Sequence, residues 1–170
     1  SVKTTEQGGP RGYDAGKKVK GRKRHLVVDT LGLVLAVLIL PAGVQDRDGA
    51  RPVIEQAKSK YPSIAKIYAD GGYAGRESSM IAQDLKIDIE VVRRPGNPTT
   101  GSIIQTSLPL EPEPTVGFKL LPKRWIVERT HAWNDKFRRL AKDWDRRLEV
   151  STAWIWLAEG RLLLNRVANS

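Results

Sequence analysis

Two apolar, β-rich runs stand out in the first quarter of the chain. They span Arg24 to Asp29 and Leu33 to Leu40, and the turn D-T-L-G, with Gly32 in its last position, separates them. Two such runs joined by a short turn are typical of a β-hairpin. The second run is apolar at every position, which predicts a central strand that is covered on both faces.

A helix and a further strand are expected after the hairpin. The pattern predicts a helix from about Gly49 to Lys60, with Asp46 or Asp48 as its N-cap and Pro52 in its first turn. The apolar run after this helix ends in Asp70, and two glycines then form a turn. The order strand, helix, strand implies a right-handed crossover and parallel pairing.

The next segment predicts one more helix and one more strand. A helix is expected from Arg76 to Leu85, with Met80, Ile81 and Leu85 facing inward. Residues 87–93 alternate with a period of two, as a half-buried strand near a sheet edge does. Prolines break the segment 95–117, which we interpret as a functional loop or an insertion.

Helical patterns return in the last third of the chain. Residues at alternating steps of four and three form one amphipathic stripe: Ile126, Thr130, Trp133, Phe137 and Leu140. A last helix is expected with Ser151 as its N-cap and with tryptophans packed in the core. The elements together predict an α/β fold.

The charge of the chain favours an anionic partner. There are 29 Lys and Arg against 19 Asp and Glu, which gives a net charge of +10. The basic residues cluster at 16–25 and 138–147, which favours nucleic acid over a merely solvated surface. The residues expected to contact phosphates from these clusters are Lys17, Lys18, Lys20, Arg22, Lys23, Arg24, Arg138 and Arg139.

Length and composition limit the class of protein. We expect one domain at 23–170, preceded by a basic, mobile arm at 1–22. The absence of cysteine excludes disulfides and thiolate metal sites. No apolar run reaches the length of a membrane span and the N-terminus does not resemble a signal peptide, so a soluble, intracellular protein is expected. His25 and His131 are expected at the surface or at caps rather than as zinc ligands.

Asp70 is the first candidate for chemistry. It lies at the carboxyl end of a predicted buried strand and precedes two glycines, which is where open α/β sheets place their ligands. An Asp-Gly pair also starts Asx-turns, so a purely structural role stays open. Asp46 and Asp48 are expected as caps, although this acidic pair could also lie near the site.

Glu128 is the second candidate, in W-I-V-E-R-T-H-A-W. Arg124 precedes it by four residues, so the two side chains can pair on one side of a helix. Glu128 lies about 200° from Ile126 around that helix, which leaves a solvent-facing ion pair as the alternative. Carboxylates from separate elements are the ligands that hold Mg²⁺ or Mn²⁺ for phosphodiester cleavage.

Three separated motifs together resemble the DDE-type transposases of bacterial insertion sequences. They are V-V-D-T-L-G-L-V-L-A-V followed by V-Q-D-R-D-G-A, then D-G-G-Y-A-G, then L-P-K-R-W-I-V-E-R-T, and the similarity extends over residues 1–167. The resemblance implies an RNase H-like mixed sheet, with an antiparallel hairpin and parallel strands, flanked by helices. It also implies an Asp-Asp-Glu triad with two metal ions, which hydrolyses the element's ends and lets the freed 3′-hydroxyl attack target DNA.

The resemblance assigns roles to individual residues. Asp70 matches the second Asp of the family, Glu128 matches its Glu, and Arg124 matches the arginine four residues earlier. Lys136 matches the basic residue two turns later, with a spacing that is off by one. The resemblance further implies Mg²⁺ or Mn²⁺ as the cofactor, double-stranded DNA as the partner, a homodimer on that DNA, and a bacterial cytoplasmic, nucleoid-associated location.

The first Asp of the family's triad has no direct match. In the family it precedes a segment like S-V-K-T-T, and this chain opens with those residues at Ser1. We therefore expect the first Asp upstream of residue 1, which would leave this chain inactive alone, with Asp29 as a substitute candidate at the hairpin tip. The alternatives are a DNA-binding remnant without catalysis and a metal-dependent nuclease that cuts but does not join.

Overall fold

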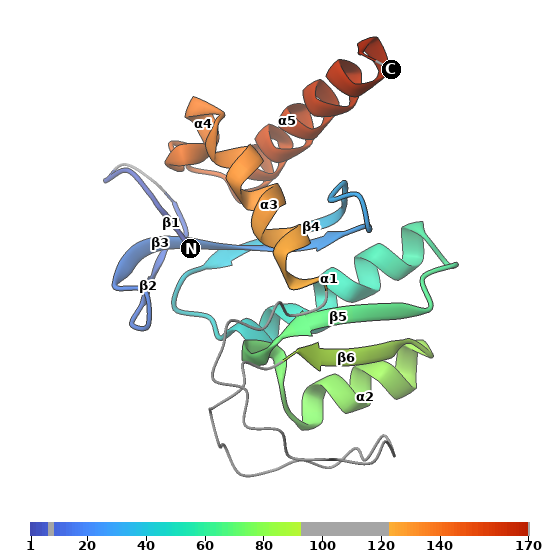
Figure 1. Ribbon diagram of the computed structural model, residues 1–170. Helices are drawn as coiled ribbons and strands as arrows, with labels where there is room; N and C mark the ends of the chain where they lie inside the picture. The colour runs from blue at the N-terminus through green and yellow to red at the C-terminus, as the bar shows by residue number, and fades with distance from the viewer. Residues whose placement is uncertain (7–8, 93–122, 170) are drawn as a thin grey trace, which may run out of the picture.

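The computed structural model describes residues 1–6, 9–92 and 123–169, without the side chain of Arg124 (Figure 1). The proline-rich segment 95–117 lies outside these residues. The elements in chain order are β1 (Val2–Lys3), β2 (Gly12–Asp14), β3 (Val19–Val28), β4 (Val34–Pro41), α1 (Asp46–Lys60), β5 (Lys66–Asp70), a 3₁₀ turn η1 (Gly71–Tyr73), α2 (Arg76–Leu85), β6 (Asp88–Val92), α3 (Arg124–Asp135), α4 (Arg138–Ala141) and α5 (Leu148–Ala168).

β3 is the central strand of a four-stranded antiparallel sheet. β4 pairs with β3 from Arg22 to Val28, which confirms the predicted hairpin. β1 pairs with the same Arg22 through Val2, so β1 and β4 lie on opposite edges of β3. β2 pairs with the first residues of β3. On the β1 side, β3 is therefore paired only at its beginning, within the part of the chain that the structure describes.

A second, two-stranded sheet contains β5 and β6. These strands pair in parallel, from Lys66 opposite Asp88 to Asp70 opposite Val92. A parallel pair is present as expected, but the partner of β5 is β6 and not the strand at 33–40, which belongs to the other sheet. Together the two sheets and their flanking helices form a mixed α/β fold that is compatible with an RNase H-like arrangement.

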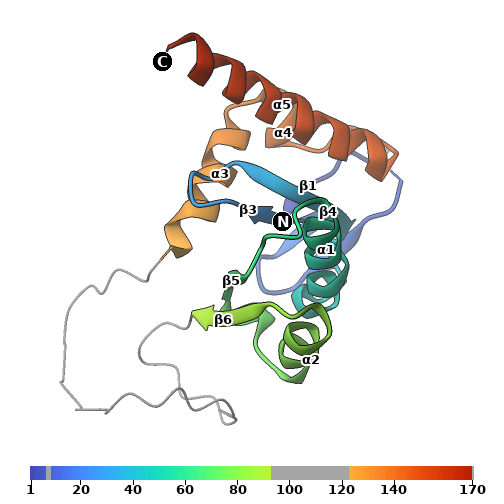
Figure 2. The ribbon, with the colours of Figure 1, turned by 90° about the vertical axis from the view of Figure 1, so that its right-hand side faces the viewer.

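Both faces of β4 are buried, as its continuous apolar run predicts. Ala36 and Leu38 pack into a cluster with α1 and α2, whereas Val37 and Ile39 pack into a second cluster with α4 and α5. Figure 2 shows this order of layers, with α5 on one side of the antiparallel sheet and α1 on the other. β4 is therefore covered on both faces as predicted, but the prediction of a central strand is wrong for the described residues, since β4 pairs with β3 alone.

The expected mobile arm at 1–22 contains regular structure. β1, β2 and the first residues of β3 all lie within it, so the interpretation as an irregular segment is wrong for these residues. β1 and β2 have two and three residues. The pattern gives β2 no clear signal, because a strand of three residues is too short to show a period of two.

Several predicted helix details are wrong. α1 begins at Asp46 with Gln45 as its N-cap, so Asp46 and Asp48 lie in its first turn and Pro52 lies in its interior. Ser151 is not a cap but a buried residue inside α5. Met80 of α2 is exposed, whereas Ile81 and Leu85 do pack inward. The stripe from Ile126 to Leu140 packs inward, although α3 and α4 divide it.

A buried ion pair joins the N-terminal sheet to the C-terminal helix. The Arg22 guanidinium lies 2.9 Å from Oδ1 of Asp143, and both side chains are almost fully inaccessible. Arg22 also donates to the Ser151 hydroxyl, which in turn donates to Asp143. Two backbone carbonyls, of Pro10 and Arg146, accept the remaining bonds of Arg22. Since this guanidinium is enclosed, its role is structural, and we leave it out of the DNA interface.

Replacing Glu159 by Gln is expected to raise the melting temperature at pH 7 and to leave it unchanged below pH 4.5. Burial between α5 and β4 raises the pKa of Glu159 above its ordinary value of 4.5. Above that pH the folded protein holds more protons at this site than the unfolded chain, so stability falls as the pH rises. Melting curves of the two proteins from pH 4 to pH 8 measure the effect, with the exposed Glu55→Gln as the control. Parallel curves over that range would contradict the prediction.

Candidate active site

One cavity brings together the three carboxylates that the sequence singled out. It has a volume of about 1310 Å³ and lies between β3, β5, α3 and the start of α1. α3 contacts both β3 and β5, and so bridges the two sheets (Figure 1). Asp29, Asp70 and Glu128 all line the cavity. The cavity is therefore the candidate active site.

Asp70 caps the turn that follows β5 and also lines the cavity. It is the last residue of β5, and its Oδ1 accepts a hydrogen bond from the Gly71 N–H at the start of η1. Its side chain is nevertheless exposed and lines the cavity. A turn-capping aspartate at the end of a strand can thus also form part of a cavity wall.

Glu128 lies on the cavity side of α3. Ile126 and Thr130, two residues before and after it, are buried, whereas Glu128 is exposed. The expectation that it faces away from the apolar stripe is therefore correct, and the face that it occupies is the wall of the cavity. The expected pairing with Arg124 stays a prediction, since the side chain of Arg124 lies outside the described part of the chain.

Asp29 is held by the hairpin turn. Its Oδ1 accepts hydrogen bonds of 2.8 Å from the backbone N–H groups of Leu31 and Leu33. The tip is fixed to α3, because the Thr130 hydroxyl donates to the Gly32 carbonyl. Gly32 has a φ of 83°, and a Cβ there would lie 3.0 Å from Oγ1 of Thr130. The position therefore requires glycine.

α3 is further fastened to the hairpin tip by stacked side chains. The Arg129 guanidinium lies 4.4 Å from the ring centre of Trp125 and 4.7 Å from that of Trp133. It also donates to the Leu31 carbonyl. The sequence pattern predicted that Trp133 packs in the core, but it did not predict that Arg129 stacks on its ring. These contacts fix the helix that carries Glu128, so they position one wall of the cavity.

The cavity has carboxylate ligands of the kind that a divalent metal ion prefers, but the described residues do not form a complete metal-binding cluster. Asp70 and Glu128 offer carboxylate oxygens, the hard ligands that Mg²⁺ and Mn²⁺ prefer. Within residues 1–6, 9–92 and 123–169, however, no three Asp, Glu or His side chains converge closely enough to hold a metal. The acidic residues that line the cavity are Asp29, Asp46, Asp70, Glu128 and Asp135. Among the described residues no three of them form a metal-binding cluster, and Asp70 and Glu128 come from separate elements.

A group at one end of the cavity escaped the sequence analysis. His25 is buried, not at the surface as predicted, and its Nδ1 lies 2.8 Å from the Tyr73 hydroxyl. Burial, together with the charges of Asp46 and Asp70, raises the pKa of Tyr73. A Cβ on Gly72 would lie 3.3 Å from Asp46, so Asp46 borders the turn that follows Asp70. Of the acidic pair that was expected as a possible neighbour of the site, Asp46 lines the cavity and Asp48 does not.

Cationic side chains line the cavity around the carboxylates. Lys17, Lys23, Arg24 and Lys123 all contribute to its walls. Lys23 pairs with Asp46 at 3.0 Å. Burial, with help from Arg24 and Lys17, lowers the pKa of His131 to about 4, so this half-buried side chain is neutral at pH 7. Positive walls around acidic side chains suit an anionic polymer that must reach those acids.

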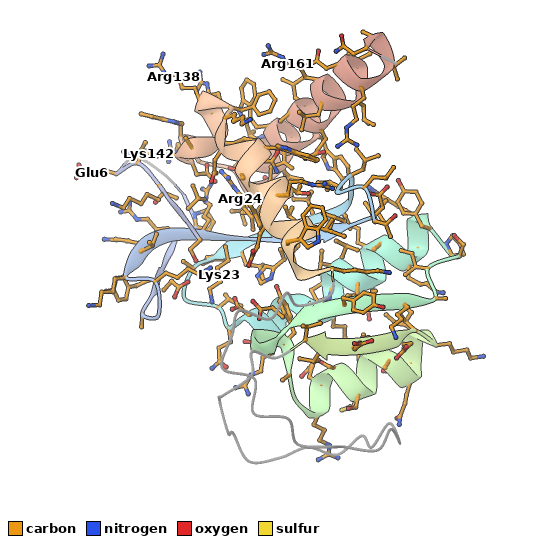
Figure 3. The ribbon with its side chains drawn as sticks, viewed as in Figure 1. Glu6, Lys23, Arg24, Arg138, Lys142 and Arg161 are labelled. Atoms are coloured by element: carbon orange, nitrogen blue, oxygen red, sulfur yellow. The ribbon has the colours of Figure 1, made fainter. Side chains whose placement is uncertain are left out.

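The predicted phosphate contacts separate into exposed and buried residues. Lys17 and Lys18 are exposed between β2 and β3, and Lys20 is exposed near the start of β3. Lys136, Arg138 and Arg139 are exposed at the junction of α3 and α4. Lys23 and Arg24 lie on β3, as Figure 3 shows, and are half-buried. The same figure places Arg138 and Lys142 at the α4 end of the molecule.

No helix among the described residues is both long enough and apolar enough to cross a membrane. α5 is the longest of them, and charged residues interrupt it.

Comparison with known proteins agrees with the family that the motifs resemble. Residues 1–159 match the family model described as "Transposase DDE domain". The chain is 28% identical over 146 residues to a Burkholderia cepacia protein named "Putative transposase for insertion sequence element IS402". That alignment covers 81% of this chain and 60% of the relative, so the chain spans about 60% of the relative's length. No solved structure gives a significant match. Because the family model covers most of its length, the chain belongs to the transposase DDE domain family.

Proposed function

We propose that this chain is the catalytic domain of an insertion-sequence transposase, which cleaves DNA phosphodiesters and joins the freed ends to target DNA. The observation that carries the proposal is the meeting of Asp70 and Glu128 on one cavity, from β5 and α3. The family match implies DNA transposition. The motif positions and the cavity support the same two carboxylates.

Asp70 and Glu128 are the residues that would hold Mg²⁺ or Mn²⁺. A divalent ion bound there would supply the activation of the attacking oxygen and the neutralisation of the leaving oxygen in phosphodiester cleavage. The chain itself holds the two acids apart on rigid elements, with Asp70 fixed by its cap to Gly71 and Glu128 fixed by the packing of α3. The lysines of the cavity wall attract the phosphate backbone.

The third carboxylate of the triad, we propose, comes from a strand seated between β3 and β5. β3 is unpaired on the β1 side after Arg22, and β5 pairs on one side only, within the described residues. β1 pairs with β3 in an antiparallel register, with Val2 opposite Arg22 and Lys3 opposite Gly21. In the same register, a residue directly before Ser1 would lie opposite Arg24. Such a strand would run through the cavity beside Asp70. Asp29 is the weaker candidate because two backbone N–H groups hold its carboxylate against the hairpin tip.

A cleavage assay on the full-length gene product tests the function. Supercoiled plasmid that carries the element's ends should be nicked in Mg²⁺ or Mn²⁺ and left intact in excess chelator. Joined products distinguish a transposase from a nuclease that only cuts. A full-length product that binds DNA but neither nicks nor joins it under these conditions would favour the DNA-binding remnant. A product that still nicks after every acid in a strand preceding Ser1 is replaced would overturn the proposed third carboxylate.

Removing exposed cations is expected to weaken DNA binding in a salt-dependent way. The triple variant of Lys17, Lys18 and Lys20 to alanine should bind duplex DNA more weakly at every sequence. Each lost phosphate contact should reduce the slope of log affinity against log salt by about 0.9. Fluorescence anisotropy over a range of salt concentrations measures this slope.

The control for this binding experiment is Lys86→Asn. Lys86 is exposed at the end of α2 in the left-handed conformation, which asparagine tolerates, and it does not line the cavity. The slope of this variant should equal that of the unchanged protein. An unchanged slope in the triple variant would remove these three lysines from the DNA interface.

A further inference from the structure

α5 carries apolar residues on two opposite faces. One face, with Ile155 and Ala158, is buried against β4. The other face is exposed and includes Leu157, at 63% accessibility, and Leu164, at 71%. A surface helix normally presents polar side chains to solvent, and one that is apolar on both sides is covered on both sides. The second face therefore needs an occupant.

The exposed face has the spacing of a coiled-coil seam. Its positions follow steps of three and four and fall within an arc of about 80° around the helix. They are Val150, Ala153, Leu157, Gly160 and Leu164, with Val167 one step further. None of these positions is charged, while Arg161, which Figure 3 labels on α5, directly follows Gly160. A Cβ added at Gly160 would meet no atom within 4 Å, so open space surrounds this position in the single chain.

The seam is complementary to its own antiparallel copy. When two α5 helices lie antiparallel about a two-fold axis between Leu157 and Gly160, Leu157 of each copy faces Gly160 of the other. In the same register Ala153 faces Leu164. Each of these layers therefore pairs a large side chain with a small one, which fills the interface. A parallel pair in register would instead place Gly160 opposite Gly160 and Ala153 opposite Ala153, and would leave voids.

We propose that α5 pairs with α5 of a second copy of this chain, antiparallel and two-fold symmetric, through this seam. A two-fold interface uses the same patch on both copies, which is the property that the seam has. The seam is one helix face, smaller than the standard interface of about 800 Å² per partner, so the dimer dissociates readily. Since each chain carries +10, added salt should strengthen the dimer, whereas it weakens phosphate contacts.

The size of the side chain at position 160 tests the pairing directly. Sedimentation velocity without DNA or metal should show a dimer that forms as the concentration rises. Gly160→Leu should weaken the dimer by about tenfold or more, because two leucines then collide in one layer. The same change leaves the monomer folded, since the space around Gly160 is open and leucine favours helices. The double variant Leu157→Ala with Gly160→Leu exchanges the sizes and should restore the dimer.

Cross-linking tests the direction of the pairing. The chain has no cysteine, so introduced cysteines report without background. A mixture of Ala153→Cys and Leu164→Cys chains should form a mixed disulfide, while neither variant alone should cross-link well. Efficient cross-linking of Ala153→Cys with itself would overturn the antiparallel arrangement. A wild-type chain that stays monomeric at all concentrations, or a dimer that Gly160→Leu leaves intact, would overturn the pairing, and neither result depends on cleavage.

Discussion

Replacing Asp70 by Asn, or Glu128 by Gln, is expected to lower metal-dependent nicking by the full-length gene product more than about a hundredfold. Even the residues that only orient metal ligands cost 10–100-fold when they are changed, so the loss of a ligand should cost more. Both substitutions keep the shape of the side chain. In Asp70→Asn the amide oxygen can still accept the Gly71 N–H that caps η1, so the turn should persist.

Two matched controls separate this effect from a general loss of charge. Asp84→Asn and Glu55→Gln remove exposed carboxylates that pair with Arg51 away from the cavity, and nicking should be unchanged. DNA affinity without metal should not fall in the Asp70 and Glu128 variants, because each has lost a negative charge near a polyanion. Full nicking by either variant would show that the cavity is not where the bond is cleaved.

Replacing Asp143 by Ala is expected to destabilise the fold by about 3–5 kcal/mol, because it leaves the buried Arg22 charge without its partner. A domain of this size is stable by only about 5–15 kcal/mol, so the loss is a large fraction of the total. Urea unfolding followed by circular dichroism measures the shift in midpoint. The variant should also bind DNA less well, because β1 and the start of β3 lose their anchor to α5.

The exposed pair of Arg51 and Asp84 provides the control for this prediction. Asp84→Ala removes an ion pair on the surface and should cost less than about 1 kcal/mol. The double variant Arg22→Met with Asp143→Leu should recover most of the lost stability, because it removes both buried charges together. If Asp143→Ala and Asp84→Ala shift the midpoint equally, the buried network does not stabilise the fold.

The elements of this fold could be predicted where the pattern of apolar residues is local and regular. β4 was predicted because every position from Leu33 to Leu40 is apolar, and the bounds of α2 match the prediction. Arg22 shows where such reasoning ends. It lies in a run of lysines and arginines that look alike, and only Asp143, 121 residues later, distinguishes it. A single sequence does not reveal contacts at that separation.

The candidate site could be predicted only where its residues belong to local motifs, because contacts between distant segments leave no signal in a single sequence. Asp70 and Glu128 belong to motifs that are visible in the chain, and the cavity unites them. His25 and Tyr73 contact each other from separate segments, and neither has a local signal beyond the tyrosine in D-G-G-Y-A-G. The role of Asp46 beside the turn depends on how α1 packs, which no spacing along the chain records.

The link between the first strands and the last helix also sets the order of folding during synthesis. The Lys3 carbonyl accepts from Asp143, and Arg22 contacts Ser151 after a loop of 129 residues. Closing so long a loop is entropically costly and slow, and contacts of this kind form late. During synthesis, Arg22 therefore has no partner for its charge until Asp143 and Ser151 have been made, and a chain that stops before Asp143 leaves that charge unpaired.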